Sequence, residues 1–143
     1  MSGSFQLFIS FNGECREAVE FYSKVFKSDV LNLMTYSQMP PDSNCTMPEA
    51  DKDKIMYCSI QIFGFTIMFA DVPAGTPFTK GNNFNPTIVT EDMDEIRRMF
   101  SELKEGGEIN MELQKTFWSD LYGMVTDKHG IIWGFSHDSG KGF

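Results

Sequence analysis

The sequence predicts an α+β fold in which a β-α-β-β-β module occurs twice within a single domain. Two amphipathic helical patterns carry this prediction, because they begin near Asn12 and Asp92, 80 residues apart. Each pattern follows one strand-like segment and precedes three more, and such internal repetition indicates a modular architecture. We expect the paired modules to form one curled mixed sheet around a concave face, with the helices outside.

Module one spans residues 5–70 and begins with a predicted strand at 5–11, where apolar side chains recur at every second position. Asn12 is the expected helix N-cap. Strands are expected at 29–36, 54–62 and 65–70, and Gly64 suits the hairpin turn between the last two. The apolar stripe of the expected helix consists of Cys15, Ala18, Val19, Tyr22, Val25 and Phe26.

Module two spans residues 84–136 and repeats this order, starting with a predicted strand at 84–90. Asp92 and Glu95 have the spacing of a capping box, and Gly106-Gly107 is a natural end for the helix. Strands are expected at 108–114, 121–127 and 131–136, with a tight turn over Asp127–Gly130. The apolar stripe of this helix consists of Met93, Ile96, Phe100 and Leu103.

Two segments rich in proline or glycine, residues 37–53 and 71–83, fit no regular element. The first is a lid, a dimer arm or a surface insertion, because unstructured loops longer than about 12–15 residues are often functional. The second is the crossover between the modules. The whole chain, residues 1–143, is thus expected to be a single domain.

The composition favours an apolar cavity over a metal site or a charged partner. The net charge is −8 with a pI of about 4.6, so we expect neither nucleic-acid binding nor attraction to an anionic membrane. The chain has 14 Phe and 10 Met but only two His. No apolar run approaches the roughly 20 residues that span a bilayer.

The three cysteines are an odd number, which indicates free thiols in a reducing cytosol and therefore a cytoplasmic location. Cys15 and Cys58 fall on apolar faces and are expected in the core, whereas Cys45 lies in the first loop and is the most reactive candidate. His129 falls in a turn and His137 near the end of the chain, so both are expected to be solvated.

Several segments resemble the vicinal oxygen chelate superfamily, which includes glyoxalases, bleomycin resistance proteins and dioxygenases. Residues 12–22 (Asn-Gly-Glu-Cys-Arg-Glu-Ala-Val-Glu-Phe-Tyr) resemble its first helix. Gly106-Gly107, residues 113–118 (Leu-Gln-Lys-Thr-Phe-Trp) and residues 122–128 (Tyr-Gly-Met-Val-Thr-Asp-Lys) resemble its PhnB-like branch. The resemblance implies paired βαβββ modules, a homodimer, and a divalent metal acting as a Lewis acid.

The resemblance also implies His, Glu or Gln ligands on the first, fourth, fifth and eighth strands. Gln6 is expected to point away from the site, because it neighbours the first of these positions. The residues of this chain at the implied ligand positions are Leu7, Met68, Asn85 or Phe84, and Gly134, with Tyr57 where PhnB-like relatives often carry His. We therefore expect no metal and no other cofactor.

The leading hypothesis is a protein that binds a small apolar molecule, without a metal, on the concave face of the sheet. Tyr57 is either a polar handle there or a half-buried strand residue, and the Trp118 segment is either a ligand wall or a packing contact. Two alternatives stay open: a metal-dependent lyase or dioxygenase with unusual ligands, and a non-catalytic interaction module. The expected pocket residues are Leu7, Ile9, Tyr57, Met68, Trp118, Tyr122 and Met124.

Overall fold

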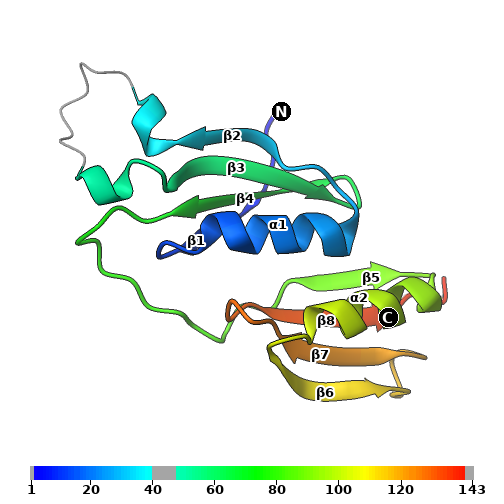
Figure 1. The fold of residues 1–143 in the computed structure, drawn as a ribbon. Coiled ribbons are helices and arrows are strands. Elements are labelled where there is room, and N and C mark those ends of the chain that lie inside the picture. The colour runs from blue at the N-terminus through cyan, green and yellow to red at the C-terminus, as the bar shows by residue number, and fades with distance from the viewer. Residues whose placement is uncertain (1, 40–47, 141–143) are drawn as a thin grey trace. The chain divides into compact units, whose positions relative to one another are not determined.

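The computed structural model describes residues 2–39 and 48–140, which form two compact units with a boundary between Phe78 and Thr79. Within these residues, each unit holds one α-helix and one four-stranded mixed sheet, so the predicted α+β repeat is confirmed (Figure 1). The expected loop at 37–53 lies partly outside the described residues. Its described parts include two 3₁₀ turns, η1 (Tyr36–Gln38) and η2 (Glu49–Asp51).

Unit 1 has the strand order β1-β4-β3-β2, in which β1 and β4 are parallel and the other pairs are antiparallel. This arrangement requires the chain to cross from β1 through the helix before it returns to the sheet. Its elements are β1 (Leu7–Phe11), α1 (Cys15–Phe26), β2 (Leu31–Thr35), β3 (Ile55–Ile62) and β4 (Phe65–Asp71).

Unit 2 repeats the arrangement with the strand order β5-β8-β7-β6, again with the first pair parallel. The strand expected at 84–90 begins only at Thr87, directly after Pro86, which has no N–H to donate to a neighbouring strand. The elements are β5 (Thr87–Thr90), α2 (Met93–Leu103), β6 (Glu108–Gln114), β7 (Tyr122–Thr126) and β8 (Ile132–His137).

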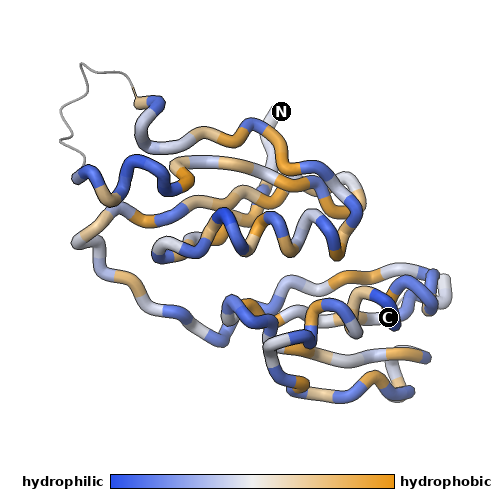
Figure 2. Tube along the Cα trace, viewed as in Figure 1, coloured by the Kyte–Doolittle hydropathy of each residue, from blue (hydrophilic) through white to orange (hydrophobic). Residues whose placement is uncertain are grey.

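The core of each unit lies between its helix and one face of its sheet. In unit 1, the ring of Phe69 lies 5.7 Å from that of Tyr22 and 6.4 Å from that of Phe11. In unit 2, the rings of Phe100 and Phe135 meet edge to face at 6.0 Å. Figure 2 shows hydrophobic and hydrophilic positions alternating along both helices, as an amphipathic helix requires.

The two helices begin in different ways. Asp92 caps α2 as predicted, because its side chain accepts a hydrogen bond from the Glu95 N–H at 3.1 Å. The prediction for Asn12 was wrong: α1 begins at Cys15, and its N-cap residue is Glu14, whose side chain makes no capping bond. The acceptor for the first amides of α1 comes instead from the end of β4.

That acceptor is the carboxylate of Asp71, which is buried. Its Oδ1 accepts hydrogen bonds from the backbone N–H groups of Gly13 at 2.8 Å and Cys15 at 3.0 Å. Its Oδ2 accepts a hydrogen bond from the N–H of Ile55 at 3.0 Å. The backbone carbonyl of Asp71 accepts one from the Tyr36 hydroxyl at 2.6 Å. One carboxylate therefore joins the end of β4 to the starts of α1 and β3.

Asp127 has a similar role in unit 2, and the predicted turn that it opens is confirmed by a 2.9 Å bond from the Gly130 N–H to its carbonyl. Its carboxylate accepts bonds from the N–H groups of His129 at 2.8 Å and Ile131 at 3.2 Å. It also accepts the indole N–H of Trp133 at 2.8 Å. These bonds satisfy a carboxylate that is only 2% exposed.

We expect Asp71→Ala to lower the free energy of unfolding by about 3 kcal/mol or more, because each donor left unsatisfied in the interior costs roughly 1–3 kcal/mol. Asp92→Ala is the matched control, since it removes one exposed cap worth about 1 kcal/mol. Urea unfolding followed by circular dichroism measures both losses. Equal losses in the two variants would contradict the role assigned to Asp71.

Candidate functional site

The face of the unit 1 sheet that α1 covers is identified by Phe69, which contacts Tyr22 on the helix. Ile9 and Cys58 are the register partners of Phe69, so their side chains point to the same face. We call this the helix face, and we call the opposite side of each sheet its open face. Because side chains alternate along a strand, neighbouring residues belong to different faces.

The structure divides the expected pocket residues of unit 1 between the two faces. Ile9 lies on the helix face, and so does Leu7, two residues earlier on β1. Met68, next to Phe69 on β4, lies on the open face, and so does Tyr57, next to Cys58 on β3.

The residue of β1 that lies on the open face is Phe8, the register partner of Met68. Its side chain is 49% exposed. Met34 joins this face as the register partner of Tyr57, and Met68 and Tyr57 are half-buried. The open face of unit 1 thus presents four large, partly exposed side chains.

In unit 2, the helix face is identified by Phe135, which contacts Phe100 on α2. Gly123 is the register partner of Phe135, so Tyr122 and Met124 on either side of it lie on the open face. Both expected pocket residues of β7 therefore share one face.

The third expected residue of unit 2, Trp118, contacts Tyr122 with ring centroids 5.3 Å apart and an interplanar angle of 75°. Phe117 lies 4.8 Å from Trp118 and is almost fully exposed, whereas Trp118 is 39% exposed. The segment between β6 and β7 thus extends the apolar surface of the open face with aromatic rings.

Tyr57 and Tyr122 lie at corresponding positions of the repeat, in β3 and β7. Tyr57 lies two residues before Ser59, which pairs with Met68 on β4. Tyr122 lies two residues before Met124, which pairs with Gly134 on β8.

In the described residues, Tyr57 lies beside Met34 on the open face of unit 1. On the open face of unit 2, Tyr122 contacts Trp118, and its register partners are Gln114 and Ser136. A phenol can donate and accept a hydrogen bond.

The model of the Glyoxalase/Bleomycin resistance protein/Dioxygenase superfamily matches residues 5–135. The chain belongs to this superfamily. Protein YjdN of Escherichia coli (strain K12) is 30% identical over 133 residues, which cover 88% of this chain and 89% of YjdN. The resemblance seen in the sequence is thereby confirmed.

Solved structures share the glyoxalase fold. Protein PA1353 from Pseudomonas aeruginosa superposes with a TM-score of 0.84 at 27% identity, covering 96% of this chain and 98% of that one. The PhnB protein from Bacillus cereus superposes with a TM-score of 0.72 at 24% identity, covering 95% of this chain and 100% of that one. Neither likeness names an activity for this chain.

The side chains at the ligand positions implied by the glyoxalase resemblance do not form a ligand set. Leu7 faces α1, and the open-face residue beside it is Phe8. Met68 offers only a thioether, which is a weak ligand for zinc or iron. Asn85 lies before β5, where its backbone carbonyl accepts a bond from Thr87 Oγ1 at 2.9 Å.

The last implied ligand position, Gly134, has no space for a side chain. A Cβ at this position would lie 2.8 Å from Oγ1 of Thr87, its register partner on β5. Across residues 2–39 and 48–140, no three His, Cys, Asp or Glu side chains gather closely enough to hold a metal ion. The residues present therefore do not fit the His and carboxylate set of the metal-dependent members.

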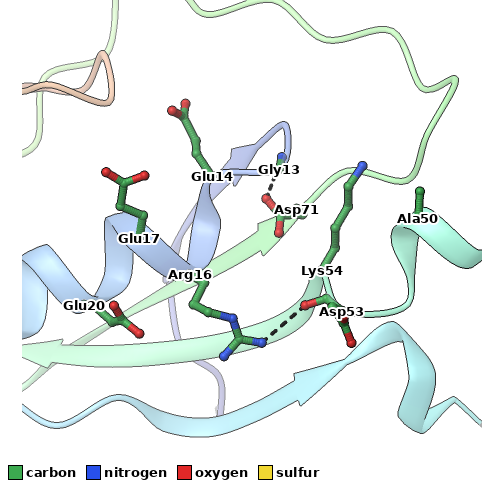
Figure 3. Close-up of a pocket in the computed structure, with 9 residues that line it drawn as sticks. All are labelled: Gly13, Glu14, Arg16, Glu17, Glu20, Ala50, Asp53, Lys54 and Asp71. Atoms are coloured by element: carbon green, nitrogen blue, oxygen red, sulfur yellow. Dashed lines mark hydrogen bonds between the residues drawn. The ribbon is translucent and has the colours of Figure 1, made fainter.

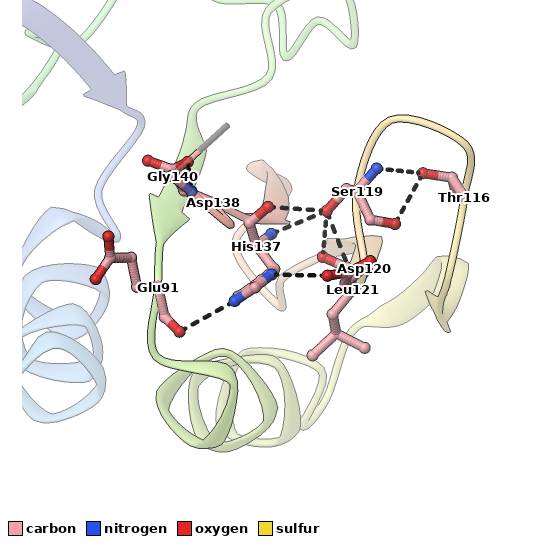
Figure 4. A network of polar contacts seen from close by, with 8 residues as sticks. All are labelled: Glu91, Thr116, Ser119, Asp120, Leu121, His137, Asp138 and Gly140. Carbon is pink, nitrogen blue, oxygen red and sulfur yellow. Dashed lines mark hydrogen bonds and ion pairs between the residues drawn. The ribbon is translucent and has the colours of Figure 1, made fainter. Parts of the chain in front are cut away.

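The expectation that both histidines are solvated was wrong. His129 is 2% exposed in the turn that Asp127 closes. The ring Nε2 of His137, at the end of β8, lies 3.1 Å from the Glu91 carbonyl, and its Nδ1 lies 3.8 Å from the Asp120 carboxylate (Figure 4). The His137 backbone is also tied to Ser119, whose hydroxyl accepts its N–H at 3.1 Å.

A hollow of about 460 Å³ lies where α1 begins, beside η2 and the approach to β3 (Figure 3). Most of the residues that line it are charged, and two of them, Arg16 and Lys54, make contacts that stabilise the fold. The Arg16 guanidinium donates to the Asp53 carbonyl at 3.2 Å, and Lys54 pairs with Asp51 at 2.7 Å, which lowers the pKa of Asp51. None of the expected pocket residues lines this hollow.

Cys15 and Cys58 are buried, as expected, whereas Cys45 lies outside the described residues.

In the part of the chain that the structure describes, no helix has the length and apolar character needed to cross a bilayer.

Proposed function

We propose that this glyoxalase-family protein binds a small apolar molecule on the open faces of its sheets, without a metal ion. The observation that carries the proposal is the composition of these faces. Partly exposed Phe8, Trp118 and methionine side chains lie there, where a binder of apolar molecules would place its contact surface. The ligand positions of the metal-dependent members hold Met68 and Gly134, which supports binding over metal-assisted chemistry.

The two phenols supply hydrogen-bonding groups to the proposed binding surfaces. Tyr57 lies beside Met34 and Tyr122 contacts Trp118, so each phenol offers a hydrogen bond next to an apolar side chain of an open face. Methionine adds adaptable surface, because its thioether is flexible and packs well against aromatic rings. We therefore propose a ligand that is mainly apolar and carries a hydrogen-bonding group.

We expect N-phenyl-1-naphthylamine, an uncharged apolar fluorophore, to bind with a saturable rise in emission that EDTA does not change. Phe8→Ala should weaken this binding by about three- to tenfold, because it removes roughly 1 kcal/mol of apolar contact.

Phe65→Ala is the matched control, because Phe65 is 72% exposed and lies on the helix-face side of the same sheet, four residues before Phe69. It should leave the affinity within about twofold of wild type. An equal loss in both variants, or loss of the signal with EDTA, would contradict the proposal. Sensitivity to EDTA would instead favour a metal-dependent lyase or dioxygenase.

We further propose that the protein is a cytoplasmic homodimer. The glyoxalase resemblance supports the dimer, and the free thiols Cys15 and Cys58 support the reducing compartment. Light scattering at micromolar concentration should give about twice the chain mass of 16.3 kDa. A mass equal to one chain would contradict the dimer.

A further inference from the structure

Cys15 and Cys58 form a buried pair of thiols between α1 and β3. Cys15 is the first residue of the helix, and Cys58 lies on the helix face of β3. Both residues are 0% exposed, and their side chains are hydrogen bonded to each other. Two thiols of one chain that are held in contact are the reactants of an intrachain disulfide.

The surroundings of the pair shift the pKa values of the two thiols in opposite directions. The hydrogen bond with Cys15 lowers the pKa of Cys58, whereas the same bond, followed by burial, raises the pKa of Cys15. The Asp71 carboxylate acts to raise the pKa of both thiols, and Arg16 acts to lower it. The interaction with Cys15 thus favours the thiolate at Cys58, and the thiolate is the form that reacts.

We propose that Cys15 and Cys58 are a redox-responsive dithiol that closes to an intrachain disulfide, with hydrogen peroxide as the oxidant. In the first step, the Cys58 thiolate attacks one peroxide oxygen, the O–O bond breaks, and a proton is taken up to give sulfenic acid and water. In the second step, the Cys15 sulfur attacks the Cys58 sulfur, and its proton leaves with the hydroxyl group as a second water. Two thiols are oxidised and one peroxide is reduced.

The disulfide would join the first residue of α1 to the middle of β3, two elements that Asp71 already holds together through the amides of Cys15 and Ile55. A cross-link between residues this far apart in the chain restricts the unfolded state. The Cys15–Cys58 pair lies on the helix face, so its oxidation does not depend on the binding proposed for the open faces.

The test uses full-length Cys45→Ser protein, in which Cys15 and Cys58 are the only two thiols. Folded protein is treated with hydrogen peroxide, alkylated with N-ethylmaleimide in urea and digested with trypsin without reductant. Cleavage after Arg16, Lys54 and Lys80 places the two cysteines in peptides 1–16 and 55–80. We expect these peptides joined, with a mass about 2 Da below their sum because two hydrogens are lost, and no alkylated thiol.

Two variants separate the steps. In Cys15→Ser/Cys45→Ser, oxidation of Cys58 should stop at the sulfenic acid, which dimedone captures. In Cys58→Ser/Cys45→Ser, Cys15 should react with dimedone less, since burial and the Asp71 carboxylate still raise the pKa of its thiol.

Free, alkylated peptides after peroxide treatment of folded Cys45→Ser would overturn the proposal. So would peptides joined only when peroxide is added in urea, or a sulfinic acid at Cys58 beside an alkylated Cys15. These three outcomes depend on the Cys45→Ser protein alone, so they decide the question even where a double variant does not fold.

Discussion

In the described residues of each unit, one α-helix packs on one face of the four-stranded sheet, and the positions of the other features follow from this packing. On the helix face, Phe69 and Phe135 are sealed by rings from α1 and α2, and Cys58 is brought against Cys15. Because side chains alternate, the neighbours of these residues must point the other way. The open faces therefore carry large apolar side chains that the helix of their own unit does not bury, and exposed apolar side chains of this kind are typical of binding sites.

Within each unit, a buried carboxylate joins segments of the chain where regular structure ends. Asp71 accepts three backbone N–H groups and Asp127 accepts two, together with the Trp133 indole. A buried carboxylate without such donors would be costly, so each is a satisfied structural group and not a candidate acid or base. The Asp71 carboxylate beside the start of α1 thus belongs to the architecture.

The repeat and most strand positions were predictable from local periodicity, and the α2 cap at Asp92 was predictable from its spacing to Glu95. Features that depend on distant residues were not. Asp71 caps amides up to 58 residues away, which no local capping pattern reveals. The parallel register of β1 on β4 decides that Phe8, and not Leu7, shares a face with Met68. Burial of His129 likewise depends on tertiary packing around its turn.

Methionine methyl groups test the central claim most directly, because they lie on both sides of the sheets. In protein carrying ¹³C-methyl methionine, the Met68 and Met124 signals report on the open faces, and Met99, 1% exposed on α2, reports on the helix side. On titration with N-phenyl-1-naphthylamine in the presence of EDTA, we expect saturable shifts at Met68 and Met124 and none at Met99. Shifts at Met99 alone, or none at saturating fluorophore, would contradict it.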